Sequence, residues 1–172
     1  NDVSNLCDGK IQYSCIPNGK GGIVDDLLIY RMSKGNYMLV VNASNMDKDW
    51  AFIENKIKDD GYNVTFENKS DDLALIALQG PNASDALSPL MNVNPGDLAY
   101  YTFICSEILG VECLVSATGY TGAGGYELYI PVVHSGMVWS KFLENGVTPC
   151  GLGARDTLRM EMGFCLYGND ID

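Results

Sequence analysis

Hydrophobic residues recur at every second position along much of the chain, in short runs separated by Gly, Pro, Asn and Asp. This period of two is typical of β-strands, because successive side chains of a strand point to opposite faces. This period, or a short apolar run bounded by turn residues, predicts strands at residues 10–16, 23–30, 36–42, 62–67, 73–79, 100–106, 111–117 and 126–130. The run at 73–79 is apolar throughout, which indicates a central strand. The glycine-rich residues 17–22 predict that the first two strands form a hairpin.

The hydrophobic period changes to that of a helix in four places. Trp50, Ile53 and Ile57 recur at helical spacing after Asn45, which is suited to capping a helix, and Gly61 ends the pattern. The charged residues between them are expected to form a solvated face: Asp47, Lys48, Asp49, Glu54, Lys56 and Lys58. Further helices are predicted at residues 83–90, at 135–143 and after 148–153. These elements predict an α+β fold of mixed, largely antiparallel sheets with packed helices.

The charge of the chain narrows the choice of partners. Its 172 residues carry a formal net charge of −11, which would repel a nucleic-acid backbone or an anionic membrane. No apolar run approaches the roughly 20 residues that span a bilayer, and the first residues lack the basic and then apolar profile of a signal peptide. We therefore expect a soluble, cytosolic protein that binds neither nucleic acid nor membrane.

The cysteines and the single histidine do not suggest a metal site. No two of the six cysteines form a Cys-x-x-Cys pair, and a zinc site needs more closely spaced ligands. The cysteines are interpreted mostly as reduced, buried residues: Cys7, Cys15, Cys105, Cys113, Cys150 and Cys165. His134 stands at the start of a predicted helix and is interpreted as a capping or surface residue.

The densest glycine cluster, at residues 118–125, joins two predicted strands. Glycine allows positive φ values and close approach of the backbone to its neighbours. The loop matches neither a dinucleotide-binding nor a phosphate-binding loop, because those open a helix and this one leads into a strand. Its hydroxyl groups, Tyr120 and the following Glu127 suit a flat small molecule with a polar edge. The alternative is a hairpin with a flexible turn and a solvated glutamate.

Asp25 and Asp26 interrupt an apolar strand and point to its opposite faces. If both faces are covered, at least one carboxylate is buried and must be hydrogen-bonded or serve a ligand, because an unpartnered buried carboxylate is costly. The alternative is that both aspartates lie at the exposed end of the strand and remain solvated.

Arg155 precedes Leu158 and Met162 by three and seven residues, which places it on the apolar side of the last predicted helix. An arginine in this position either extends its charge to solvent or binds an anion, and its planar group of donors suits a carboxylate. A structural ion pair with Glu127 or Glu161 is the alternative to ligand binding.

Four segments of the sequence resemble the T-protein family of the glycine cleavage system. They are Gly21–Leu27, Ala77–Pro81, Gly119–Gly122 with Gly125–Glu127, and Gly151–Arg159 with Leu166–Gly168. Their order and spacing match the family along essentially the whole chain. The chain corresponds to about the middle half of a typical member, so we expect a fragment without the N-terminal part and the C-terminal domain.

The resemblance implies a tetrahydrofolate-dependent aminomethyltransferase without a metal. In this reaction the aminomethyl group on the lipoyl arm of the H-protein passes to tetrahydrofolate, and ammonia is released. The essential aspartate of the family falls on Asp26, with Asp25 as the second choice. The residues that contact the pterin fall on Tyr120 and Glu127, and the substrate-contacting arginine falls on Arg155. The family also implies the bacterial cytoplasm or, in a eukaryote, the mitochondrial matrix.

The resemblance further implies two interleaved subdomains, roughly residues 1–68 and 69–172. Two other functions remain open. Similar folate-binding modules occur in demethylases, in sarcosine and dimethylglycine dehydrogenases, and in tRNA-modifying and iron–sulfur-assembly proteins, where the donor differs. A module that binds folate without transfer activity is the second alternative. The Asp-Asp-Leu strand and the Gly-Leu-Gly-Ala-Arg-Asp segment favour the T-protein.

Overall fold

The computed structural model describes residues 2–172, which form two compact units. Unit 1 comprises residues 2–69 and 165–172, and unit 2 comprises residues 70–164. The last eight residues thus belong to the first unit, whereas the boundary drawn from the sequence placed them in the second. No helix within residues 2–172 is both long enough and apolar enough to cross a membrane.

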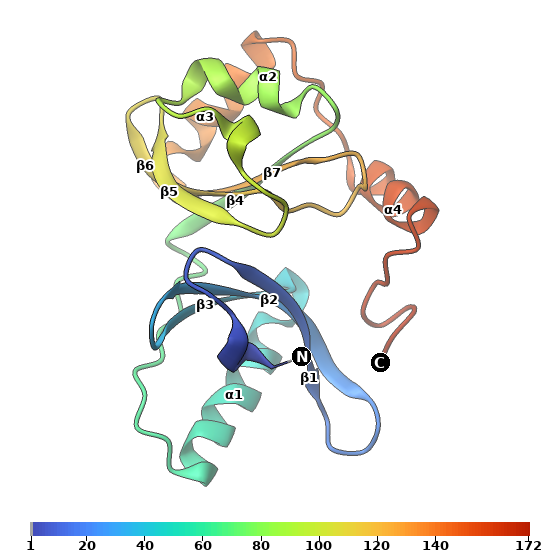
Figure 1. Ribbon diagram of the computed structural model, residues 1–172. Coiled ribbons are helices and arrows are strands. Elements are labelled where there is room, and N and C mark those ends of the chain that lie inside the picture. The colour runs from blue at the N-terminus through green and yellow to red at the C-terminus, as the bar shows by residue number, and fades with distance from the viewer. Residues whose placement is uncertain (1) are drawn as a thin grey trace. The chain divides into compact units, whose positions relative to one another are not determined.

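Unit 1 is built on a three-stranded antiparallel sheet of order β1-β2-β3 (Figure 1). Its elements are η1 (Val3–Asn5), β1 (Ile11–Pro17), β2 (Ile23–Ser33), β3 (Asn36–Val41), η2 (Ala43–Asn45) and α1 (Met46–Asp60). The C-terminal segment joins the unit where the amide of Ile23 donates to the carbonyl of Asp172 over 3.0 Å. The predicted hairpin and the third strand are confirmed.

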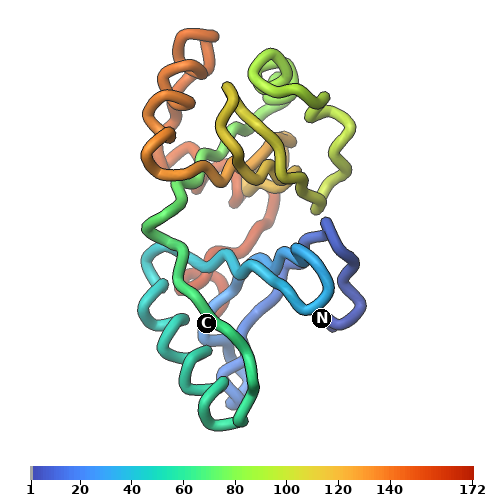
Figure 2. Tube along the Cα trace, turned by 90° about the vertical axis from the view of Figure 1, so that its left-hand side faces the viewer, coloured from blue at the N-terminus to red at the C-terminus, as the bar shows by residue number. Residues whose placement is uncertain are grey.

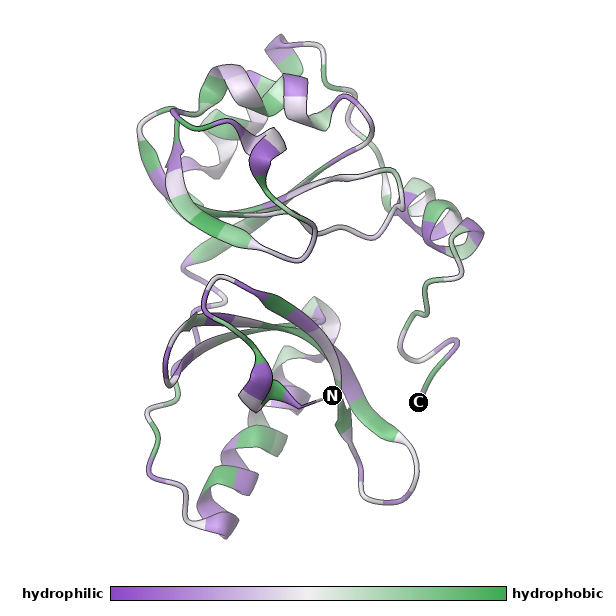
Figure 3. Cartoon of the chain, viewed as in Figure 1, coloured by the Kyte–Doolittle hydropathy of each residue, from purple (hydrophilic) through white to green (hydrophobic). Residues whose placement is uncertain are grey.

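Helix α1 carries both hydrophobic and hydrophilic residues, and it ends where predicted (Figure 3). Gly61 takes the left-handed conformation with φ 68°, which a glycine adopts without steric cost, and its amide bonds to the last turn. Asn45 does precede the helix, but its side chain makes no capping hydrogen bond. It instead donates to Asp25 over 2.7 Å, so this residue connects the helix to strand β2.

The strand predicted at residues 62–67 is not formed. This segment runs alongside α1 as irregular chain (Figures 1 and 2). The ring of Phe66 stacks on Trp50 with centroids 4.1 Å apart. The apolar residues of the segment therefore pack against a helix. The strand prediction was wrong because periodicity does not show whether a partner strand is available.

Unit 2 contains a four-stranded antiparallel sheet of order β4-β7-β6-β5. The strands are β4 (Leu73–Gln79), β5 (Phe103–Ile108), β6 (Val111–Ser116) and β7 (Gly125–Pro131). Strand β4 is at the edge of this sheet, whereas its continuous apolar run had predicted a central strand. Its neighbour β7 is central, and its pairing places Ala77 and Ser116 on either side of Glu127.

Helices α2 and α3 cover one face of this sheet (Figures 1 and 2). The helical elements of the unit are α2 (Ala83–Leu87), η3 (Ser88–Leu90), η4 (Pro95–Asp97), α3 (Val132–Glu144) and α4 (Leu152–Glu161). Leu87, Val138 and Phe142 of the helices pack with Leu128 and Ile130 of β7 in one buried core. Because neighbouring residues of a strand point to opposite faces, Glu127 lies on the face away from this core.

Two predictions about burial were wrong. Cys113 is buried, and burial raises the pKa of its thiol to about 11, but the other five cysteines are exposed. In α4 the buried side chain is Arg159, whose Nε bonds to Asp156 over 2.8 Å. Leu158 and Met162, predicted on the packed side of the helix, are 38% and 50% exposed. The spacing of apolar residues showed which side chains share a face, but not which face the fold covers.

Candidate functional site

The loop between β6 and β7 depends on its glycines in two ways. Gly122, Gly124 and Gly125 have φ values of 67°, 76° and 136°, which favour glycine. Gly119 has an ordinary φ value but lies against Gln79, and a Cβ atom placed there would be 1.9 Å from the Gln79 Oε1 atom. The sequence prediction of close backbone approach is therefore confirmed at Gly119.

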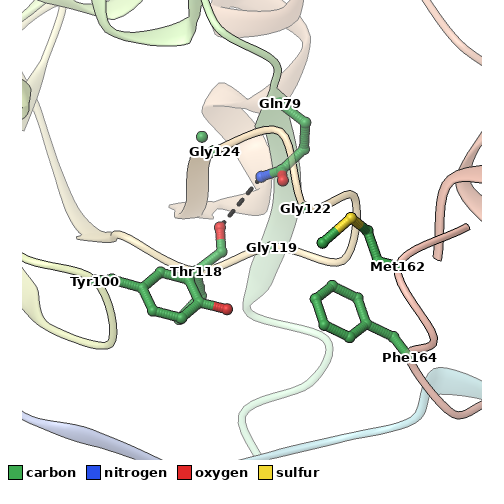
Figure 4. A pocket seen from close by; sticks show the side chains of 9 residues that line it. Gln79, Tyr100, Thr118, Gly119, Gly122, Gly124, Met162 and Phe164 are labelled. Atoms are coloured by element: carbon green, nitrogen blue, oxygen red, sulfur yellow. Dashed lines mark hydrogen bonds between the residues drawn. The ribbon is translucent and has the colours of Figure 1, made fainter.

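Gln79, at the end of β4, holds this loop through its side-chain amide (Figure 4). Its Nε2 atom donates to the carbonyls of Thr118 and Tyr126 over 3.2 and 3.1 Å. Its Oε1 atom accepts a hydrogen bond from the hydroxyl of Thr121 over 3.2 Å. One side chain thus satisfies backbone and hydroxyl groups on both sides of the glycine cluster, which fixes the loop against the edge of the sheet.

Replacing Gly119 by alanine is expected to destabilise unit 2 by about 1–3 kcal/mol, the usual cost of overpacking. The added methyl group would displace the Gln79 amide and break its bonds to the loop. Urea unfolding of the full-length protein measures the loss. Gly136→Ala is the matched control, because this residue lies within α3 and its Cβ would meet nothing within 4 Å. Equal effects of the two substitutions would contradict this role of Gln79.

A cavity of about 300 Å³ opens beside the loop (Figure 4). Its lining combines the backbone of the glycine loop with aromatic, thioether and amide side chains: Gln79, Tyr100, Thr118, Gly119, Gly122, Gly124, Gly125, Met162 and Phe164. Met162 and Phe164 follow α4 and face the loop across the cavity. Largely apolar walls with a few polar groups are typical of small-molecule sites, and this volume is at the lower end of their usual range.

Tyr120 lies between an aromatic ring and a cation. Its ring stacks on Phe164 with centroids 5.8 Å apart and planes 18° apart. The guanidinium carbon of Arg155 lies 5.0 Å from the centre of the Tyr120 ring, within the range of a cation–π interaction. The structure therefore brings Tyr120 and Arg155 together, although they are 35 positions apart in the sequence.

Glu127 lies at the end of a chain of hydroxyl groups. The Thr118 hydroxyl donates to its Oε2 atom, and the Ser116 and Thr118 hydroxyls are 2.7 Å apart. Ser116 and Thr118 are buried, and Glu127 is half-buried. Burial raises the pKa of Glu127 above its ordinary value, while the Thr118 hydrogen bond and the charge of Arg155 oppose the shift. The solvated glutamate that was the alternative is therefore wrong.

In unit 1, Asp25 is fully buried and densely hydrogen-bonded. Its Oδ1 atom accepts from the amide of Asp26 and from Asn42, each over 2.8 Å, and its Oδ2 atom accepts from Asn45. Burial alone would raise the pKa of Asp25, but hydrogen bonds from Asp49, Asn42, Asn45 and the Asp26 backbone outweigh it, so the pKa lies below its ordinary value. The alternative that both aspartates are solvated is excluded.

Asp26 is half-buried, and each of its carboxylate oxygens has a fixed partner. Asn42 donates to Oδ1 over 2.7 Å, and the Tyr13 hydroxyl donates to Oδ2 over 2.7 Å. The Asn42 contact follows from the sheet, because Leu27 pairs with Val41 and thereby brings the next residue, Asn42, beside Asp26. Burial and the charge of Asp26 raise the pKa of Tyr13, so it remains a donor.

Sequence reasoning missed several residues that organise these sites. Asn42 and Tyr13 hold Asp26, and Gln79 holds the glycine loop. Asn42 could have been noticed because it directly follows a strand that neighbours the aspartates. Gln79 lies in the family segment Ala77–Pro81, but no feature of the sequence assigned it a role. Asp49 was predicted on a solvated helix face, but it is only 1% exposed. Charge patterning in one helix could not show that this residue faces Asp25.

The fold and the two clusters define an α+β protein with a largely apolar cavity in unit 2 and a hydrogen-bonded aspartate pair in unit 1. The chain belongs to the GCVT N-terminal domain family, which matches residues 1–172. The predicted family and the α+β fold are thereby confirmed.

Individual relatives agree with this membership. The chain is 50% identical to proteins named aminomethyltransferase from Flavobacterium psychrophilum and Bacteroides fragilis, with all of this chain and 48% of each relative covered. The crystal structure of the glycine cleavage system aminomethyltransferase T from Bartonella henselae matches with a TM-score of 0.85 at 32% identity. That match covers 99% of this chain and 45% of the other. The chain therefore spans about half the length of these relatives.

Proposed function

We propose that the full-length protein is the aminomethyltransferase of a glycine cleavage system. It transfers the aminomethyl carbon from the lipoyl arm of an H-protein to tetrahydrofolate and releases ammonia. Relatives at about 50% identity over the whole chain carry the name aminomethyltransferase, which supports this reaction over the demethylation and dehydrogenation of similar folate modules. These relatives are bacterial, and we place the enzyme in the cytoplasm.

The observation that carries the proposal is the placement of Glu127 beside the glycine loop. A half-buried carboxylate can accept two parallel hydrogen bonds, and the amino and amide edge of a pterin presents two such donors. One oxygen of Glu127 already accepts from Thr118, which fixes the carboxylate. Tyr120, held between Phe164 and Arg155, supplies an aromatic surface for the ring. Glu127 and Tyr120 do not line the cavity of unit 2 themselves, but their partners Thr118 and Phe164 do. We assign this cavity, together with the adjoining side chains, to the folate.

We assign the chemical step to Asp26, with Asp25 as its buried support. The aminomethyl carbon forms a bond to a nitrogen of tetrahydrofolate as its bond to the lipoyl sulfur breaks and the reduced lipoyl thiol leaves. Departure of ammonia from this carbon then leaves an iminium-like positive charge shared with the folate nitrogen, and a fixed carboxylate stabilises such a charge without reorganising. Asp26 fits this role because Asn42 and Tyr13 hold its two oxygens in place. Asp25 accepts several internal hydrogen bonds and is fully buried, so it is less suited to meet a substrate. Arg155 is assigned to an anionic group of the substrate.

The decisive experiment is turnover by the full-length protein with an aminomethylated lipoyl H-protein and tetrahydrofolate. Methylated amine donors are tested in parallel, and calorimetric titration with tetrahydrofolate measures binding separately. We expect methylenetetrahydrofolate and ammonia only with the aminomethylated carrier. Turnover with methylated donors would assign the protein to the related demethylases or dehydrogenases. Folate binding without any turnover would leave a binding module and overturn the proposed reaction.

A further inference from the structure

A second buried carboxyl group lies beside the aspartate pair and is not used in the reaction proposed above. Asp49, in the first turn of α1, is 1% exposed, and Asp25 is fully buried. The Nζ atom of Lys48 is 3.9 Å from an oxygen of each of them. One lysine, itself 42% exposed, therefore faces two buried carboxyl groups. Two buried negative charges with one partial counter-charge are unfavourable.

The hydrogen bonds distinguish the two carboxyl groups. Both oxygens of Asp25 accept bonds from Asn42, Asn45 and the Asp26 amide, which is the environment of a charged carboxylate. Neither oxygen of Asp49 accepts a hydrogen bond from a donor among the described residues. A buried carboxylate without donors is costly, whereas a protonated carboxyl group can itself donate to a neighbouring carboxylate. The arrangement is satisfied when Asp49 carries a proton and Asp25 does not.

The surrounding charges support this distribution. Burial and the negative charge of Asp25 raise the pKa of Asp49 to about 7, with a smaller contribution from Asp26, while Lys48 opposes the shift. Lys48 is directed partly elsewhere, because it donates to the Val24 carbonyl over 2.6 Å and to the Tyr167 hydroxyl over 3.1 Å. It also lies 4.3 Å from the centre of the Tyr167 ring. The lysine therefore neutralises Asp49 only in part.

We propose that Asp49 is a positioning residue whose shared proton holds Asp25 and, through Asn42, the carboxylate of Asp26. The link is direct, because the Nδ2 atom of Asn42 donates to Asp25 over 2.8 Å and to Asp26 over 2.7 Å. When Asp49 loses its proton, its negative charge repels that of Asp25. Asn42, the donor that Asp25 and Asp26 share, is then no longer held in one place. The effect on turnover rests on the proposed function, whereas the shared proton itself does not.

The shared proton predicts a direction for stability against pH. Between the ordinary pKa of 3.8 and about 7, the folded protein keeps the Asp49 proton and the unfolded chain has lost it. The folded state then binds more protons, so the free energy of unfolding falls as pH rises through this window. Glu127 contributes a slope of the same sign, because its pKa is also raised. Asp25, with its lowered pKa, changes stability only below its ordinary range.

The test compares Asp49→Asn and Asp49→Leu with the wild-type full-length protein. Asparagine can donate to Asp25 as the protonated acid does, but it does not titrate. Between pH 4.5 and 6, urea unfolding of Asp49→Asn is expected to show a pH slope smaller by about one proton than that of the wild type. Asp47→Asn, an exposed change on the same helix, is the charge-matched control and keeps the wild-type slope. Equal slopes for Asp49→Asn and the wild type would overturn the proposal.

Kinetics test the positioning role. In the wild type, kcat is expected to fall between pH 6 and 8.5 as Asp49 loses its proton, by up to about 30-fold for a pKa near 7. This fall is expected to be absent in Asp49→Asn. Asp49→Leu, which cannot donate, is expected to lower kcat about tenfold or more with KM for tetrahydrofolate within about twofold. Unchanged kcat in Asp49→Leu would overturn the positioning role. A wild-type protein without turnover would instead refute the proposed reaction, and the urea slopes would still decide the shared proton.

Discussion

Asp26→Asn is expected to lower kcat of the full-length protein by about 10²–10³-fold, the usual loss when one preorganised electrostatic group is removed from a transition state. The amide has the shape of the carboxylate but lacks its charge, so it cannot stabilise a developing cation. Rapid-quench or steady-state measurement of methylenetetrahydrofolate formation gives kcat, and calorimetry gives folate affinity. Folate affinity should change by less than about threefold, because the substitution acts on the chemical step.

The control for this prediction is Asp59→Asn, which makes the same change of charge at an exposed position of α1. It should retain wild-type kcat. Asp25→Asn separates the two neighbouring aspartates, because Asp25 is buried and accepts from Asn42, Asn45 and the Asp26 amide. We expect it to reduce stability as well as turnover. If Asp26→Asn keeps full activity while a stably folded Asp25→Asn loses activity, the chemical role belongs to Asp25.

Glu127→Gln is expected to weaken tetrahydrofolate binding by about 10- to 100-fold, which corresponds to the roughly 1.5–3 kcal/mol of a hydrogen bond to a charged group. Glutamine keeps the size of the side chain and an oxygen that can accept from Thr118. Glutamine has an NH₂ group in place of the second carboxylate oxygen, and this hydrogen-bond donor would face a donor of the pterin edge. Calorimetric titration of the full-length protein measures the change. Glu112→Gln, exposed on β6 of the same sheet, is the matched control.

The raised pKa of Glu127 adds a pH dependence to this prediction. Because burial raises this pKa, the carboxylate takes up a proton at a higher pH than an ordinary glutamate. Folate affinity should therefore fall as pH is lowered through the raised pKa, and Glu127→Gln should lack this fall. Wild-type affinity in Glu127→Gln at neutral pH would show that the pterin edge is recognised elsewhere.

The local elements could be predicted because their signals are short in range. Alternation or a short apolar run between turn residues identified strands β1 to β7, and helical spacing with Gly61 identified α1 and its end. The predictions failed where a partner had to be known. Residues 62–67 alternate like a strand but pack Phe66 on Trp50, and the apolar β4 lies at a sheet edge. Periodicity describes what a segment can bury, and tertiary contacts determine what it is buried against.

The candidate site divides in the same way. The sequence by itself determined which residue types were out of place: two acids in an apolar strand, a glycine cluster entering a strand, and the family motifs that contain them. Only the tertiary structure decided their states. It buried Asp25 rather than Asp26, set Asp49 beside it, and placed Thr118 against Glu127. A pKa depends on solvent exclusion and on charges a few ångströms away, and residues distant in the sequence supply both.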